Sequence, residues 1–268
     1  TAVGYKATNF HMLCRELAIN AGLNFKPPKE DEASKEFWET RAPELMIEAL
    51  KTYPDERYDA VIVDEGQDFR EYWWLAVEKL LKYPKNGHLW VFFDPQQDLY
   101  GGGPTEALGL QAASLTWNCR NTERIAAHAF GRIGMVPKLK PGTPEGTPVR
   151  ELACDTDQEM VDAVRKTLHQ LVTEEKLDTD RIVVLSPRGA QASPVWRARK
   201  LGNLTLVEFP QRPGPREIAF ASLQRFKGLE ADAVILCDVR EGDPASGPAH
   251  MYVGTSRARH VLVVAKYR

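Results

Sequence analysis

An acidic pair stands directly after an apolar run, where α/β proteins often place catalytic groups. Asp64 and Glu65 follow the run 61–63 (VIV) and are themselves followed by a Gly-Gln-Asp turn. The first acid of such a pair can hold Mg²⁺, and the second can orient or deprotonate a water that attacks a γ-phosphate. A strand end with a plain polar turn is the alternative for this segment taken alone.

A second apolar run carries the same kind of ending. Residues 88–93 (HLWVFF) are followed by Asp94, and Gln97 comes three positions later. If the two runs are adjacent parallel strands, their carboxyl ends meet at one edge of a sheet. Asp64, Glu65, Asp94 and Gln97 would then lie along that edge. Clustered carboxylates repel, so this arrangement requires a metal ion or cationic groups to compensate them.

The elements that must position these groups form a βαβ unit. The sequence predicts strands at 58–64 and 88–94, because both are continuous apolar runs. Between them, residues 72–83 carry apolar side chains at helical spacing. Two buried strands joined by a helix are typical of a parallel sheet.

The rest of the chain repeats this alternation and predicts a second α/β body. We expect strands at 182–185, 204–209, 218–223, 233–239 and 261–265. We expect helices at 122–133, 158–173, 194–201 and 250–259, and an additional helical segment at 33–50. Gly and Pro predict surface loops at 136–147 and 210–215, and the Gly-Gly-Gly-Pro break at 101–104 is where we place the domain boundary.

Composition excludes several classes of protein. Of 268 residues, 43% are hydrophobic and 27% are charged, which is ordinary for a globular chain and excludes disordered and collagen-like proteins. The four cysteines lie far apart with no C-x-x-C spacing, so reduced thiols are expected rather than a disulfide scaffold or a zinc site. No apolar stretch approaches the ~20 residues of a membrane span, and the start is unlike a signal peptide. The expectation is a soluble, cytoplasmic protein.

The near-zero net charge conceals a difference between the two parts of the chain. Residues 1–112 hold 12 basic and 19 acidic side chains, whereas residues 113–268 hold 23 basic and 18 acidic ones. This split favours two bodies with different surfaces, or one body that faces an anion. Chance and solvated helix faces are the alternative.

Six segments, in order along the chain, resemble motifs of superfamily 1 helicases of the UvrD/Rep kind. Residues 64–68 (DEGQD) resemble motif II, residues 94–101 (DPQQDLYG) resemble motif III, and residues 8–13 (TNFHML) are similar to the Thr-Phe-His-x-Leu segment that precedes motif II. Residues 115–122 (LTWNCRNT) resemble motif IV, residues 222–230 (SLQRFKGLE) resemble motif V with its Lys-Gly-Leu-Glu core at 227–230, and residues 252–258 (YVGTSRA) resemble motif VI.

The resemblance implies an ATP-driven motor with two RecA-like domains of the P-loop NTPase class, which close on a nucleotide. ATP and Mg²⁺ would be its cofactors, and its partner would be single-stranded DNA or a duplex with a single-stranded tail. In this reading Asp64 holds Mg²⁺ and Glu65 activates the water. Gln97 senses the γ-phosphate.

The resemblance implies further site residues in the second part of the chain. Arg120 and Arg257 resemble the paired arginine fingers, and a guanidinium suits this role because it is always charged and forks onto phosphate oxygens. Glu230 resembles the motif V acid that approaches the ribose, and Gly228 would allow the backbone close to the ligand. Surface arginines and a plain Lys-Gly turn are the alternatives.

Several other side chains have open interpretations. Thr255 and Ser256 either bind a ligand or hydrogen-bond the backbone of their own helix. His11 is either a packed histidine or a DNA contact. Trp73 and Trp74 are expected to be packing groups on a helix rather than stacking platforms.

The chain departs from the family at several positions. No G-x-x-x-x-G-K-[ST] loop occurs in the 268 residues. Cys119 stands where the family has an adenine-stacking aromatic, residues 101–104 replace an aromatic-Arg-Gly-Ala segment with Tyr100 as the nearby aromatic, and Gln224 stands where a histidine is common.

The simplest account of the missing loop is a C-terminal piece of a longer protein. Residues 1–112 would be the C-terminal part of the first RecA-like domain, with a reduced accessory insertion, and residues 113–268 the complete second domain. We expect such a piece to have little ATPase activity by itself. The alternatives are a helicase-like module that binds nucleotide or DNA without unwinding, and a motor that acts on RNA.

Overall fold

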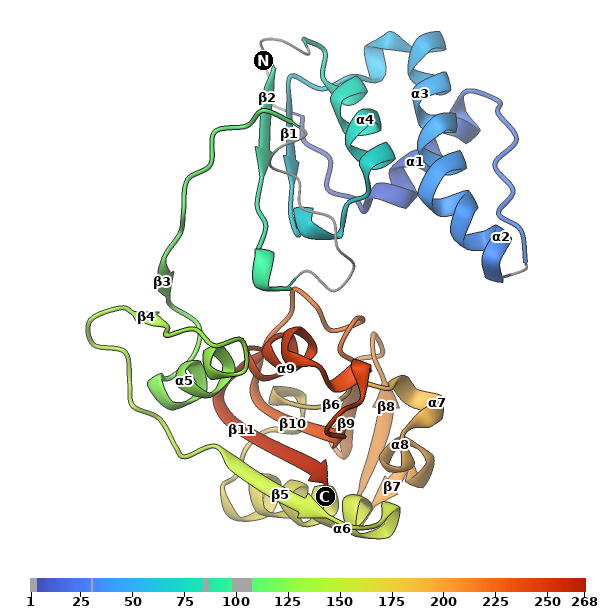
Figure 1. Cartoon of the computed structure of the whole chain (residues 1–268). Coiled ribbons are helices and arrows are strands. Elements are labelled where there is room, and N and C mark those ends of the chain that lie inside the picture. The colour runs from blue at the N-terminus through green and yellow to red at the C-terminus, as the bar shows by residue number, and fades with distance from the viewer. Residues whose placement is uncertain (1–3, 30, 84–86, 98–107) are drawn as a thin grey trace. The chain divides into compact units, whose positions relative to one another are not determined.

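The computed structural model describes residues 4–29, 31–83, 87–97 and 108–268 (Figure 1). The chain divides into two compact units, Thr1–Ala112 and Ala113–Arg268, here called unit 1 and unit 2. Three features expected from the sequence lie outside the described residues: Asp98 and Tyr100 of the motif III segment, and the break at 101–104.

Unit 1 combines a short parallel sheet with a group of helices. Strands β1 (Ala60–Val63) and β2 (His88–Val91) pair in parallel, as the two apolar runs predict. The helical elements are α1 (Phe10–Asn20), α2 (Asp31–Glu36), the π-helical turn η1 (Phe37–Arg41), α3 (Ala42–Thr52), η2 (Pro54–Glu56), η3 (Gly66–Asp68), α4 (Glu71–Leu80) and η4 (Pro95–Gln97).

Local sequence explains why α1 begins and where it packs. The Asn9 side chain caps the helix by accepting a hydrogen bond from the Met12 amide at 2.8 Å. The buried residues of α1 lie three or four positions apart and face α3, whose own buried stripe completes a small core. These side chains are Leu13, Cys14, Leu17 and Ala18 in α1, and Leu45, Met46, Ala49 and Leu50 in α3.

Helix α4 joins β1 to β2 and covers one face of their sheet. Val63 packs with Trp74 and Val77 of α4, while the alternate strand residues point to the other face. On that other face the side chains of Ile62 and Trp90 are 70% and 61% exposed.

Unit 2 is built on a mostly parallel sheet of seven strands, in the order β5-β11-β10-β6-β9-β8-β7. Every neighbouring pair is parallel except β7 and β8. The strands are β5 (Arg150–Cys154), β6 (Ile182–Ser186), β7 (Lys200–Leu201), β8 (Leu204–Glu208), β9 (Glu217–Ser222), β10 (Ala231–Val239) and β11 (Ala258–Tyr267). The main helices are α5 (Glu123–Gly131), α6 (Asp157–His169), α8 (Pro194–Ala198) and α9 (Pro248–Thr255).

Helices cover both faces of this sheet, which gives three layers (Figure 1). Alternate residues of the central strands enter two different cores: Val184 and Ile235 pack with α6 and α8, whereas Val183 and Val234 pack with α5 and α9. The central strands are therefore buried along their length, because helices cover both faces of this parallel sheet. The mixed α/β fold expected from the alternation of strands and helices is confirmed.

Smaller elements complete unit 2. Short strands β3 (Trp117–Asn118) and β4 (Lys138–Leu139) pair in parallel ahead of the main sheet. The π-helical turn η5 (Gln170–Glu174) extends α6. The remaining pieces are η6 (Thr179–Arg181), α7 (Gly189–Ala192) and η7 (Pro244–Ser246).

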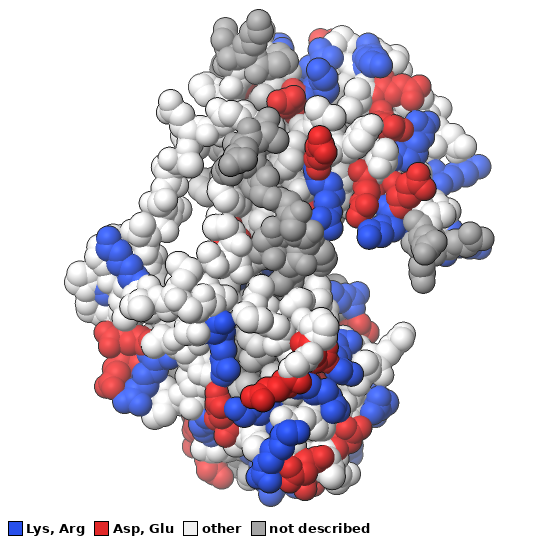
Figure 2. Space-filling model, viewed as in Figure 1, with Lys and Arg blue, Asp and Glu red and all other residues white. Residues whose placement is uncertain are grey.

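The basic excess of unit 2 does not form a separate patch on the face shown in Figure 2, where Lys and Arg alternate with Asp and Glu. Several of its arginines are paired with acids, including Arg181 with Asp232 and Arg188 with Asp243. None of the helices in the described part of the chain has the length and apolar character that a membrane crossing needs.

Candidate functional site

In unit 1, the acidic pair lies at the carboxyl end of β1, as the sequence predicts. Asp64 directly follows the strand, and its Oδ1 accepts a hydrogen bond from the Glu65 amide at 2.9 Å. Glu65 adopts the left-handed backbone conformation, with φ of 52°. This conformation is uncommon for a residue with a side chain, and such strained positions concentrate at functional sites.

Gly66 holds this turn against the neighbouring strand. Its amide donates to the Phe92 carbonyl at 2.9 Å, and the Phe92 amide donates to the Val63 carbonyl at 2.8 Å. A Cβ atom at position 66 would lie 2.5 Å from Val91 Cγ1. The close approach therefore requires glycine.

The buried side chain of Gln67 connects the two strand ends. Its Nε2 donates to Glu65 Oε2 at 2.5 Å, and its Oε1 accepts from the Asp94 amide at 3.1 Å. Asp94 Oδ2 in turn accepts from Gln97 Nε2 at 2.8 Å. The structure thus brings Asp64, Glu65, Asp94 and Gln97 to one sheet edge.

Sequence reasoning did not single out Gln67 as the link between the strands. Its place between Glu65 and Asp68 was a signal, because an amide is both donor and acceptor and can join a carboxylate to a backbone amide. That Asp94 is its second partner, 27 residues away in the chain, appears only in the folded structure.

Hard oxygen ligands at this edge have the chemistry that Mg²⁺ prefers. Asp64 is exposed and Asp94 is half-buried. Within the residues described, no three His, Cys, Asp or Glu side chains are grouped as metal ligands. Mg²⁺ is commonly held by one or two carboxylates together with substrate phosphates, and Asp64 could serve as such a ligand.

In unit 2, three segments far apart in the chain converge. The buried Asn121 side chain donates from Nδ2 to the Ser256 and Ala258 carbonyls, at 3.0 and 2.6 Å. Arg120 Nε donates to Glu230 Oε2 at 2.8 Å. The segments 118–121, 227–230 and 252–258 therefore meet in one place, beside the start of β10 and β11.

Arg120 and Glu230, which the helicase resemblance relates to phosphate and ribose, are bonded to each other in this structure. Both side chains are partly exposed, and Glu230 Oε1 also lies 3.6 Å from Arg259 Nε. Asn118 supports the segment by accepting the amide of Arg120 at 3.2 Å. Arg120 and Glu230 therefore form an ion pair at the surface of unit 2.

Arg257 lies inside unit 2. Its side chain is 1% exposed, and its Nε donates to the Val253 carbonyl at 3.0 Å. Its Nη1 lies 3.4 Å from the Leu229 carbonyl, and its Nη2 donates to Ser256 Oγ at 3.1 Å. Arg257 thus ties α9 to the 227–230 segment.

Gly228 adopts the left-handed conformation, with φ of 78°. This conformation favours glycine, so the position has a backbone requirement of its own. Thr255 Oγ1 donates to the Met251 carbonyl at 2.6 Å, and Ser256 Oγ donates to the Val253 carbonyl at 3.1 Å. Both hydroxyls thus bond the backbone of α9, which is one of the two interpretations that the sequence left open.

No protein-family model matches the chain, and no curated protein matches it. Among solved structures, the chain is similar to the C-terminal domain of a possible DNA helicase from Lactobacillus plantarum WCFS1. The two are 19% identical with a TM-score of 0.40, and the match covers 56% of this chain and 88% of the other.

Proposed function

We propose that this chain forms part of an ATP-dependent DNA helicase or translocase of the UvrD/Rep kind, which couples ATP hydrolysis to movement on single-stranded DNA. Unit 1 would be the C-terminal part of its first RecA-like domain, and unit 2 its second RecA-like domain. ATP and Mg²⁺ would be the cofactors.

One observation carries the proposal: the helicase-like segments are brought together within each unit. In unit 1, Gln67 joins the end of β1 to the start of the motif III segment through Glu65 and Asp94. In unit 2, Arg120 joins the motif IV segment to the motif V segment, and Asn121 joins it to the motif VI segment. The order of the segments along the chain and their convergence in the fold together support the proposal.

The site residues would divide the work of phosphoryl transfer. Asp64 would hold Mg²⁺ at the phosphates, and Glu65 would accept the proton of the attacking water. Gln97 would sense the γ-phosphate. Arg120 would stabilise the charge that develops on the phosphate oxygens, once a nucleotide competes with Glu230 for its guanidinium.

The remaining positions would act through the backbone and the fold. Gly228 would let the chain approach the nucleotide, and Glu230 would contact the ribose. Arg257 would complete the arginine pair. Because Arg257 is buried and bonded to backbone carbonyls, its truncation would damage the fold as well as any chemistry.

The isolated 268-residue chain should hydrolyse no ATP, because its sequence contains no phosphate-binding loop. Phosphate release is measured with Mg²⁺ and ATP, with and without single-stranded DNA. Turnover by the pure chain that Glu65→Gln abolishes would contradict this expectation.

The motor itself is tested by the reading frame upstream of Thr1. If a G-x-x-x-x-G-K-[ST] sequence is encoded there, the protein that includes it should hydrolyse ATP in the presence of single-stranded DNA. Glu65→Gln should then lower the rate at least 100-fold, since it removes a general base. Glu48→Gln, the same change at an exposed position on α3, is the matched control.

The alternative is a helicase-like module that binds nucleotide or DNA without unwinding. The missing loop in these 268 residues is the observation that favours it. An upstream frame without a phosphate-binding loop, together with DNA binding that ATP does not affect, would select the module over the motor.

A further inference from the structure

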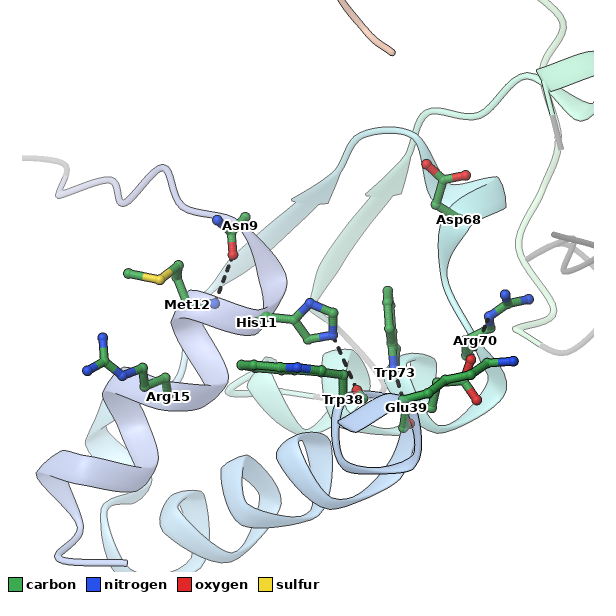
Figure 3. A pocket seen from close by; sticks show the side chains of 10 residues that line it. Asn9, His11, Met12, Arg15, Trp38, Glu39, Asp68, Arg70 and Trp73 are labelled. Atoms are coloured by element: carbon green, nitrogen blue, oxygen red, sulfur yellow. Dashed lines mark hydrogen bonds and ion pairs between the residues drawn. The ribbon is translucent and has the colours of Figure 1, made fainter. Parts of the chain in front are cut away.

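An open groove of about 580 Å³ lies on unit 1, and its lining includes Asp68 of the η3 turn that follows the acidic pair. Its walls come from α1, the η1 turn and α4 (Figure 3). Three rings lie at its centre: His11 stands between Trp38 and Trp73 in Figure 3, with ring centroids 4.9 and 4.6 Å away. The aromatic surface is therefore built from three separate elements.

The surrounding structure holds these rings rigidly. Trp73 stacks on Phe10 with 5.0 Å between ring centroids, and its Nε1 donates to the Glu39 carbonyl at 3.1 Å. His11 Nε2 lies 3.2 Å from the Trp38 carbonyl. All three groove rings are half-buried. Aromatic rings ordered before binding lose little conformational entropy when a ligand stacks on them.

Cationic side chains flank the rings. Arg15 lies four residues after His11, so the two share one face of α1. Arg15 and Lys35 both line the groove and make no ion pair with any described residue. Arg70 also lines the groove, where it lies 3.8 Å from Glu39, and Asp68 is the second acid.

Burial lowers the pKa of His11, so its imidazole is neutral at pH 7. The positive charge available to a ligand therefore comes from Arg15 and Lys35. A groove with a rigid aromatic floor and two available cations fits a ligand that combines flat rings with negative charge.

We propose that this groove binds single-stranded nucleic acid, with a base stacked on Trp38 and the adjoining phosphates paired with Arg15 and Lys35. The inference rests on the proposed function, because it assigns part of the DNA contact of that motor to residues outside the helicase-like motifs. Trp73 packs against Phe10, His11 and Phe69, as its helical spacing predicts, and supports the groove from below.

The test is equilibrium binding of a fluorescein-labelled 15-nucleotide oligo-dT to the 268-residue chain, followed by anisotropy at low salt. Trp38→Ala should weaken binding at least tenfold, because stacking on an aromatic ring carries much of the affinity for a single strand. Trp38→Phe, which keeps a ring, should retain part of it. Trp90→Ala, at an exposed position on β2, is the matched control and should change affinity less than twofold.

The salt dependence tests the phosphate contacts separately. Arg15→Ala should reduce the slope of log K against log salt by about 0.7, the value expected for one lost contact to single-stranded phosphate. Lys51→Ala, an exposed basic position at the end of α3, should leave the slope unchanged. Thermal melts of each variant exclude loss of folding.

The outcomes separate this inference from the proposed function. If wild type, Trp38→Ala and Arg15→Ala bind the oligonucleotide equally well, the groove is not the binding site. The chain would then bind DNA at another surface, and the proposed function would stand. No binding by the wild type would overturn the groove, whereas the proposed function would still be decided by the DNA-dependent ATP hydrolysis of the protein that includes the upstream frame. Displacement of the oligonucleotide by an equal concentration of free ATP, with the same loss in Trp38→Ala, would assign the groove to a mononucleotide and overturn the inference.

Discussion

At the scale of single residues, Asp238 has a surrounding that its sequence did not indicate. It lies near the end of β10 with φ of 61°, and its side chain is 1% exposed. Its Oδ1 has no hydrogen-bond partner among the described residues. Burial raises the pKa of Asp238, although hydrogen bonds from Ser193 and Ser186 partly offset this.

A raised pKa has a definite consequence for stability. The folded state favours the protonated carboxyl, so the stability linked to Asp238 is complete at low pH and is lost as the pH rises through its raised pKa. The nearby carboxylate of Asp157 raises the pKa further. An uncharged side chain of the same shape should therefore increase the stability of unit 2 most at neutral pH.

We expect Asp238→Asn to stabilise unit 2 at pH 7–8 by on the order of 1 kcal/mol, and this gain should shrink as the pH falls toward about 4, the ordinary pKa of an Asp in the unfolded chain. Asparagine tolerates the left-handed conformation at this position. Thermal melts between pH 4 and 8 measure the difference.

Asp243→Asn is the control for this pH profile. Hydrogen bonds from the Ala245 amide and the Arg188 guanidinium lower the pKa of Asp243, so its contribution is lost as the pH falls. The two variants should show opposite pH dependence. A profile for Asp238→Asn that runs parallel to that of the wild type would contradict the assignment.

At the scale of elements, the turn after β1 depends on the absence of a side chain at Gly66. A methyl group there would meet Val91 Cγ1 at 2.5 Å and Trp74 at 3.4 Å. Gly66→Ala should therefore destabilise unit 1 by about 1–3 kcal/mol through overpacking. Because Asp64 and Glu65 precede this turn, the variant should also displace the acidic pair.

Chemical denaturation of Gly66→Ala measures this cost. Gly131→Ala is the matched control, because a Cβ at the end of α5 meets no other group within 4 Å. Alanine there should be neutral or slightly stabilising. If Gly66→Ala lost no more free energy of unfolding than Gly131→Ala, this would show that β2 shifts to admit the new methyl group without destabilising unit 1.

The boundaries of the elements show where periodicity is informative. The predicted strand at 261–265 is the apolar centre of β11, which extends over Ala258–Tyr267. Its polar ends pair with neighbouring strands through backbone hydrogen bonds, which depend little on side-chain type. The helical segment expected at 33–50 is confirmed as one unbroken helical run, in which the π-helical turn η1 joins α2 to α3.

At the scale of the whole molecule, the two units have separate cores. In unit 2 helices cover both faces of the sheet, whereas the β1–β2 sheet of unit 1 leaves Ile62 and Trp90 largely exposed. Buried apolar surface is the main source of stability, so unit 1 should be the weaker of the two.

We expect two transitions in calorimetric unfolding of the 268-residue chain. Residues 113–268 produced alone should show the transition at the higher temperature. Gly66→Ala should lower the temperature of the unit 1 transition and leave that of unit 2 unchanged. A single cooperative transition in the full chain would show that the units depend on each other for stability.

The sequence by itself determined the α/β class, the alternation of strands and helices, and the acidic groups at two strand ends. These features follow from local periodicity and from the order of residues along the chain, which a sequence displays directly. Gln67 was the part of that edge that sequence reasoning missed, because its partners come from two different strands.

Only the tertiary structure decided the partners of the basic residues and the position of the aromatic groove. Arg120 and Glu230 are 110 residues apart in the chain, yet they form an ion pair. Arg257 resembles an exposed charge in the sequence but is buried against backbone carbonyls. Its surroundings, like those of Trp38 and Trp73, depend on which distant segments pack together, and no local pattern of residues encodes that contact.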